Sequence, residues 1–138
     1  MHSRKTITLL TAALFVMSAA VAFHPRWSSG VSRMNGQPFA FVESLLDPGN
    51  TYFELRNVAG NATLYVPAAV AATLMLKSPV AATFLVGGVA ALVELLQLLM
   101  ADRVSDVDDI ILALIGALVA TSITHLVVTS REVANHDQ

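Results

Sequence analysis

The chain has 138 residues, of which 55% are hydrophobic and only 13% charged, with a net charge of −2. An average soluble domain carries about 25% charged residues, so the composition favours a protein whose solvent is lipid. Without a basic cluster we expect no nucleic-acid partner, and without cysteine the chain has no disulfide, thiol catalysis or cysteine metal site. The length predicts at most one domain. The apolar segments described below predict that the protein lies in the cell membrane and crosses it several times.

The first apolar segment covers residues 6–23, after Arg4 and Lys5 and before Pro25. It is long enough for a short membrane-spanning helix. A basic start followed by the small-residue pattern Ala20-Val21-Ala22 is also typical of a cleaved secretory signal. We favour a retained helix because the apolar stretch is long for a signal and three further spans follow.

Residues 24–57 form a polar loop that we expect outside the membrane. Within it, Phe39–Leu46 predicts a short interfacial helix or strand, and Trp27, Phe39 and Phe41 suit the headgroup layer. The sequence Asp47-Pro48-Gly49-Asn50 predicts a turn.

Three more spans are predicted at about residues 58–76, 80–100 and 109–128, with Pro67 kinking the first of them. Lys77-Ser78-Pro79 forms a tight connection, and an acidic turn covers residues 101–108. The tail, 129–138, is polar and expected to be disordered. The fold class is therefore an all-α membrane protein, a bundle of four transmembrane helices within residues 4–128.

Orientation follows from the basic residues that flank the spans. With the N-terminus in the cytoplasm, four basic residues lie on each side of the membrane. The first helix breaks this tie, because Arg4 and Lys5 precede it and Arg26 alone follows closely. We therefore predict that both chain ends are cytoplasmic.

Small and polar residues recur three or four positions apart on each of the last three spans, so each span has one stripe suited to close helix packing. The stripes are Asn57, Asn61, Tyr65, Ala68 and Ala72 on the second span; Thr83, Gly87, Ala90, Ala91, Glu94 and Gln97 on the third; and Asp109, Ala113, Gly116, Ala120 and Thr124 on the fourth.

The polar ends of these stripes fall at one depth, near the outer surface. The predicted polar cluster is Asn57, Asn61, Glu94, Gln97, Arg103, Asp106 and Asp109. Charges at that depth need partners or a function, and we expect Glu94 and Arg103 to pair. The alternative is that Glu94 and Gln97 only join helices.

The acidic turn also has a structural interpretation. Asp106 is a candidate N-cap of the last helix, with Asp108 and Asp109 favoured by the dipole of its first turn. Asp108 is expected to point away from the bundle, because it lies about 100° around the helix from Asp109. Asp109 is expected to point inward, toward Asn61 and Glu94.

Together these residues resemble the VanZ-like family of small multi-spanning membrane proteins, whose type member is associated with low-level resistance to the glycopeptide teicoplanin. The resemblance covers about residues 4–128, and the positions that carry it are Asn61, Pro67, Glu94, Gln97, Arg103, Asp106, Asp109 and Gly116. The family usually has an asparagine one turn after the last aspartate, where this chain has Ala113. An activity that needs this amide would be lost here.

The leading functional hypothesis is a non-enzymatic envelope protein that needs no cofactor. Its outward polar site would engage a membrane lipid, a lipid-linked envelope precursor or another amphiphile. Arg103 would contact a phosphate or carboxylate, and Asn61 and Gln97 would supply amides.

Two other hypotheses stay open. In a membrane enzyme acting on a lipid phosphate or glycan, Glu94 would be the candidate general base. Asp106 and Asp109 would then be weak candidates for holding a divalent cation. In a transporter subunit, four short helices would have to form a homo-oligomer.

Overall fold

The computed structural model describes residues 9, 12–18, 20, 34–49, 51–99 and 105–136. In chain order the labelled elements are β1 (Met34–Asn35), α2 (Ala40–Leu46), α3 (Thr51–Leu64), α4 (Val66–Leu76), α5 (Pro79–Gln97), β2 (Ser105–Asp106) and α6 (Val107–His136). Within the described part, three helical stretches are long and apolar enough to cross a membrane: Thr51–Leu76, Pro79–Gln97 and Val107–Asn135. The predicted helical membrane protein is confirmed to that extent.

The fourth predicted span stays a prediction, because only residues 9, 12–18 and 20 of the first apolar segment are described, all of them helical. The hydroxyl of Ser18 donates to the Leu64 carbonyl at 3.0 Å. This carbonyl belongs to the last turn of α3, where helix geometry leaves acceptors without a partner in the helix. Phe15 packs against the same core. The described part of the segment therefore lies against the bundle.

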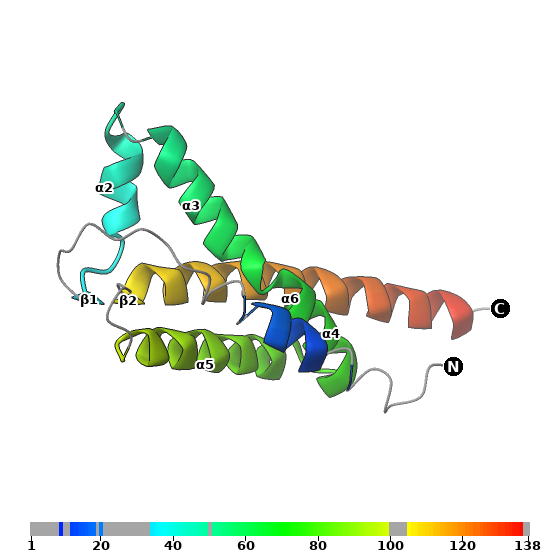
Figure 1. The fold of residues 1–138 in the computed structure, drawn as a ribbon. Coiled ribbons are helices and arrows are strands. Elements are labelled where there is room, and N and C mark those ends of the chain that lie inside the picture. The colour runs from blue at the N-terminus through cyan, green and yellow to red at the C-terminus, as the bar shows by residue number, and fades with distance from the viewer. Residues whose placement is uncertain are drawn as a thin grey trace.

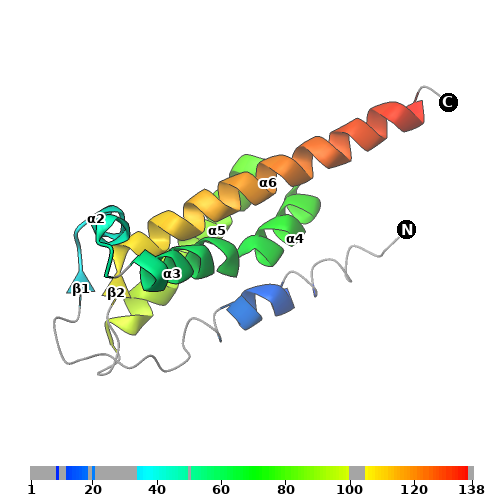
Figure 2. The same cartoon turned by 90° about the horizontal axis from the view of Figure 1, so that it is seen from above.

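α5 and α6 run side by side, whereas α3 leans away from them toward its N-terminal end (Figure 1). α2 packs beside that outer end of α3. Seen from above, α2 and the two short strands gather around the start of α6 (Figure 2). β1 and β2 pair in parallel, with Met34 opposite Ser105 and Asn35 opposite Asp106. This pairing holds the segment before α2 at one end of the bundle.

Small side chains make up the centre of the bundle. Ala68, Ala72, Ala82, Ala113 and Ala117 have no exposed surface. Of the three predicted stripes, most positions are buried or half-buried, but Ala91 is exposed and that assignment is wrong. Alanine and glycine allow helix backbones to approach closely, so dispersion contacts and hydrogen bonds can hold helices together where lipid offers no hydrophobic drive.

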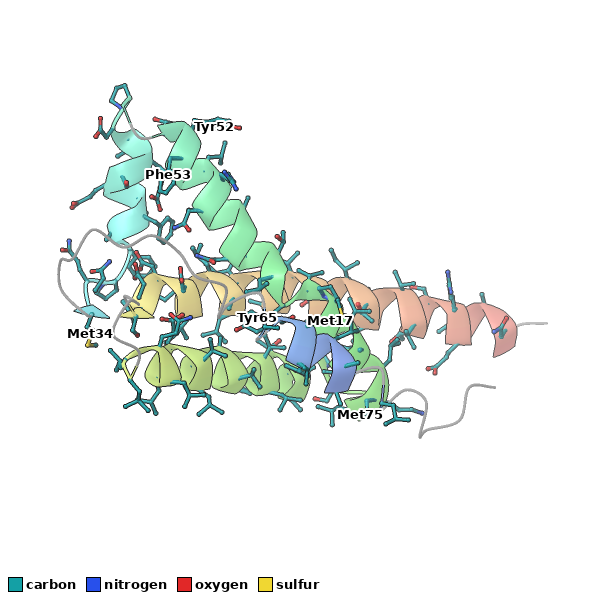
Figure 3. The ribbon with its side chains drawn as sticks, viewed as in Figure 1. Met17, Met34, Tyr52, Phe53, Tyr65 and Met75 are labelled. Atoms are coloured by element: carbon teal, nitrogen blue, oxygen red, sulfur yellow. The ribbon has the colours of Figure 1, made fainter. Side chains whose placement is uncertain are left out.

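The joint between α3 and α4 is the predicted kink. Pro67 is the second residue of α4 and has no N–H for the hydrogen bond that a continuous helix would make to Thr63. Tyr65 interrupts the helix, with φ −98° and ψ 0°. Figure 3 shows Tyr65 at this joint, inside the bundle, while Tyr52 and Phe53 lie at the far end of α3.

The connection between α4 and α5 is as tight as expected. Lys77 has a left-handed backbone with φ 53°, and its N–H donates to the Thr73 carbonyl at 2.8 Å. Ser78 caps α5 by accepting the Ala81 N–H at 3.2 Å, and Pro79 begins the helix. Proline suits the first helical position because that position has no internal partner for an N–H.

Two helix bounds differ from the prediction. α3 begins at Thr51 and not near residue 58, because the Thr51 N–H and hydroxyl both bond to the Asp47 carbonyl in the predicted turn, at 3.0 and 2.9 Å. The tail is helical to His136 and not disordered up to that residue. It contains no glycine or proline to stop α6, and the Ser130 hydroxyl bonds back to the Leu126 carbonyl at 2.8 Å.

Candidate functional site

The predicted polar ends of three helices meet around one small cavity. Its volume is about 20 Å³, which is enough for about one water molecule. The lining comes from α3 and the α3–α4 joint, from α5 and from α6: Asn61, Leu64, Tyr65, Ala90, Glu94, Gln97 and Asp109. The structure therefore brings Asn61, Glu94, Gln97 and Asp109 together around one cavity.

Asn61 and Asp109 connect α3 to α6. The amide of Asn61 donates to the carboxylate of Asp109, and Asn61 is only 5% exposed. Hydrogen bonds to a charged acceptor are stronger than those between neutral groups, and more so where water is excluded. The predicted inward direction of Asp109 is confirmed. Ala113, one turn further on, is fully buried, so it fills with a methyl group the place where the family usually has an amide.

Asp106 is the central residue of the acidic turn. Its backbone N–H donates to Glu94 at 2.8 Å, which gives this buried carboxylate a partner from β2. One of its own carboxylate oxygens accepts the Asp108 N–H at 2.9 Å, as predicted for an N-cap of α6. The other accepts the side-chain amide of Asn35 at 3.1 Å. The predicted partner of Glu94, Arg103, lies outside the described residues.

Asp108 does not point away from the protein as predicted. It is 4% exposed, and its two carboxylate oxygens accept the backbone N–H groups of Phe39 at 2.6 Å and Phe41 at 3.0 Å. The expected exposure to head groups or water was wrong, because β1–β2 pairing brings the segment before α2 over that side of α6. Asp108 thereby supplies the N-cap acceptor that α2 lacks, since Phe39 stands at its own N-cap position.

A signal for this contact was present in the sequence. A helix that starts after Phe39, a residue with no side-chain acceptor, leaves donors that must be satisfied from elsewhere in the chain. Asn35, which also joins this network, was not predicted either. Nothing in the spacing of residues 35–41 indicates that their partners lie about 70 positions later.

A larger cavity lies outside the small one and shares Asp109 with it. We call it the acidic cavity; its volume is about 210 Å³. It lies between α2, the outer part of α3 and the start of α6, and its lining is Asn35, Ala40, Phe41, Ser44, Glu54, Asn57, Asp106, Asp108, Asp109 and Leu112. Four carboxylates line it, together with amides, a hydroxyl and apolar side chains. Asn57 and Asp106, both predicted, lie here and not at the small cavity.

The acids of this region do not form a metal centre within the described residues. No group of three or more histidine, cysteine, aspartate or glutamate side chains in that part of the chain is arranged to hold a metal ion. Both carboxylate oxygens of Asp106 already accept hydrogen bonds from Asn35 and Asp108. Their arrangement instead joins the first turn of α6 to β1, α2 and α5.

Comparison with known proteins identifies the family of the chain. The family model described as VanZ/LLP1 matches residues 6–128, which is most of the chain. No curated protein and no solved structure gives a significant match. The matched range includes α3 to α5, most of α6 and both cavities. The chain belongs to the VanZ/LLP1 family.

Proposed function

We propose that this protein of the cell envelope binds the polar head of a lipid-linked or amphiphilic envelope molecule at the outer leaflet. The observation that carries the proposal is the acidic cavity, about 210 Å³ in volume, at the polar end of a helical membrane bundle. Polar side chains at membrane depth are costly unless they are paired or used. Here the hydrogen-bonded carboxylates Asp106, Asp108 and Asp109 form one wall of the acidic cavity, which is large enough for a small head group.

The lining indicates which chemical groups the acidic cavity accepts. Carboxylate oxygens accept hydrogen bonds, so Glu54 and the aspartates suit hydroxyl, amide N–H or ammonium groups of a ligand. Phe41 and Leu112 add apolar surface against which a sugar ring or peptide side chain packs. Arg103, in the stretch between α5 and β2, is the proposed contact for a phosphate or carboxylate. The lipid tail would remain in the bilayer beside the bundle.

A glycopeptide link is suggested by the family resemblance, because the type member of the VanZ-like family is associated with teicoplanin resistance. Teicoplanin is an acylated glycopeptide with sugar hydroxyls and amine groups, and so has the amphiphilic character proposed for the ligand. Expression of the chain in a glycopeptide-susceptible bacterium is expected to raise the inhibitory concentration of teicoplanin more than that of vancomycin, which lacks the acyl chain. An equal rise for both would contradict a role for the lipid-like part.

Binding is tested with purified protein in lipid nanodiscs and a fluorescent lipid-linked disaccharide-pentapeptide as the probe. Ser44→Trp fills the acidic cavity from α2 without changing charge, because Ser44 lines the cavity. Val42→Trp is the matched control: it adds the same ring to the same helix at an exposed position outside the lining. We expect Ser44→Trp to abolish binding and Val42→Trp to retain it. Equal affinities in the two variants would refute the site.

The small cavity supports a second candidate function. It places room for one water molecule beside Glu94, Tyr65 and Asp109, which is the arrangement a membrane hydrolase of lipid phosphates or glycans would need for general-base attack by water. Purified protein is then expected to release phosphate or sugar from such lipids, and Glu94→Gln to stop the release. Binding without turnover would favour the non-enzymatic proposal.

A further inference from the structure

A third cavity lies at the other end of the bundle and takes no part in the proposed site. Its volume is about 150 Å³, and it lies between the end of α4 and the C-terminal half of α6. The lining residues are Thr73, Leu74, Lys77, His125, Val128, Thr129 and Glu132. On α6 they recur three or four positions apart, so they share one face of the helix. The cavity thus has both apolar and charged walls.

The depth of this cavity follows from the length of α6. Thr129 lies 23 residues after Asp106, which is about 34 Å along a helix that rises 1.5 Å per residue. The hydrocarbon core of a bilayer is about 30 Å thick. If Asp106 lies at one boundary of the hydrocarbon, Thr129 lies at the other. Leu74 and Val128 then face acyl chains, and Glu132 lies about one turn further toward water.

The charges of the cavity are of both signs. Lys77 supplies an ammonium group, which suits a phosphate ester. Glu132 supplies a carboxylate that accepts hydrogen bonds from a primary ammonium. Within the described residues, Lys77 and Glu132 form no ion pair with each other or with another side chain. On α6, His125 lies about one turn deeper than Val128 and Glu132 about one turn nearer the water, while Lys77 follows the last residue of α4.

We infer that this cavity binds a zwitterionic phospholipid whose head group carries a phosphate and a primary ammonium, as in phosphatidylethanolamine. The phosphate lies against Lys77, the ammonium against Glu132, and the acyl chains against Leu74 and Val128. Phosphatidylcholine has the same charges, but its quaternary ammonium cannot donate a hydrogen bond to Glu132. Phosphatidylglycerol keeps the phosphate and has no ammonium group. The three lipids therefore distinguish the two contacts.

The test is native mass spectrometry of the detergent-solubilised full chain with equimolar phosphatidylethanolamine, phosphatidylcholine and phosphatidylglycerol. We expect one phosphatidylethanolamine to be retained in preference to the other two lipids. Lys77→Gln should lower its retention by about tenfold, the effect of one charge-assisted hydrogen bond. Glu132→Gln should abolish the preference over phosphatidylglycerol while retaining binding of a phosphate lipid.

Arg131→Gln is the matched control for Lys77→Gln, because it removes the same charge at the same end of the bundle and Arg131 does not line the cavity. Its lipid retention should equal that of the unmodified chain. Thr129→Trp fills the cavity without changing charge and should reduce retention if the site is real. Equal effects of Lys77→Gln and Arg131→Gln would overturn the inference, as would equal retention of all three lipids. Displacement by equimolar soluble phosphoethanolamine would overturn the assignment of the ligand as a lipid.

Discussion

Asn61 in α3 donates its side-chain amide to the carboxylate of Asp109 in α6, and this bond joins the two helices at the depth of both site cavities. Asp109 lines both cavities, and Asn61 lines the small one. The bond therefore has one effect on the stability of the bundle and another on the shape of the site.

The first prediction concerns that bond. Asn61→Ala and Asp109→Ala should each destabilise the protein by about 1–3 kcal/mol, because each removes a hydrogen bond between a buried amide and a carboxylate. The double variant should cost less than the sum of the two single variants. Thermal unfolding in detergent measures all four proteins of the cycle. Simple additivity would show that the two side chains act independently.

The second prediction concerns Asp108 and the start of α2. Asp108→Asn replaces one acceptor oxygen by a donor, so either the Phe39 or the Phe41 N–H loses its partner. Hydrogen exchange at these two amides should become about tenfold faster, which corresponds to about 1.4 kcal/mol. Asp47→Asn removes the same charge at the other end of α2 and should leave both rates unchanged. Equal protection in the two variants would contradict the proposed cap.

The third prediction tests the close approach of α3 and α6. A Cβ atom on Gly116 would lie 1.7 Å from the backbone oxygen of Ala62, so Gly116→Ala must push the helices apart. We expect a loss of about 1–3 kcal/mol, or failure to assemble. Gly88→Ala is the control, since a Cβ atom there meets nothing within 4 Å. It should be neutral or slightly stabilising, because alanine favours a helix.

The fourth prediction concerns the hydroxyl pair of Thr83 and Thr121, whose oxygens lie 2.9 Å apart between α5 and α6. Thr121 is fully buried. Hydrogen bonds of this kind within membranes contribute about 0.6 kcal/mol on average. Thr83→Val, Thr121→Val and the double variant should therefore lower stability by similar, small amounts. A double variant that costs twice each single would show that each hydroxyl acts through its own helix backbone.

The fifth prediction is the orientation of the chain. Because the sequence has no cysteine, Gly36→Cys and Ser130→Cys each introduce a single labelling site. Both residues are exposed. In intact cells a membrane-impermeant maleimide should label Gly36→Cys and not Ser130→Cys. The reverse pattern would move the acidic cavity to the cytoplasmic side. Labelling of both would mean an even number of spans between the two residues and would contradict the three spans assigned there.

Helical periodicity predicted most of the site. Spacing alone brought Asn61, Glu94, Gln97 and Asp109 to one depth, because a helix in lipid has few ways to place polar side chains. The cap formed by Asp106 was also predicted, because its donor, the Asp108 N–H, lies only two residues away in the chain. Asp108 was misassigned because its partners are backbone groups of a distant segment. Phe39 at the N-cap of α2 indicates that donors there need an acceptor, but the sequence does not indicate which one, and only the β1–β2 pairing shows where it lies.

Helix ends were predicted less well than helix centres. The apolar pattern ends near residue 58, but α3 continues outward to Thr51, because a helix stops at a lost hydrogen bond and not at a change in polarity. The same reasoning applies to the tail, where α6 runs on to His136. Both extensions consist of polar residues beyond the apolar stretch from which a membrane span is predicted, so the prediction did not include them.

The contact between Asp108 and the residues around Phe39 also sets an order of assembly. The two partners lie 69 and 67 positions apart, and the acceptor belongs to the last helix to be synthesised. Synthesis proceeds from the N-terminal end, so Asp108 can accept these two N–H groups only after α6 has been made. The outer wall of the acidic cavity is therefore completed last. A chain interrupted before α6 would contain most of the helices of the bundle and still have no site.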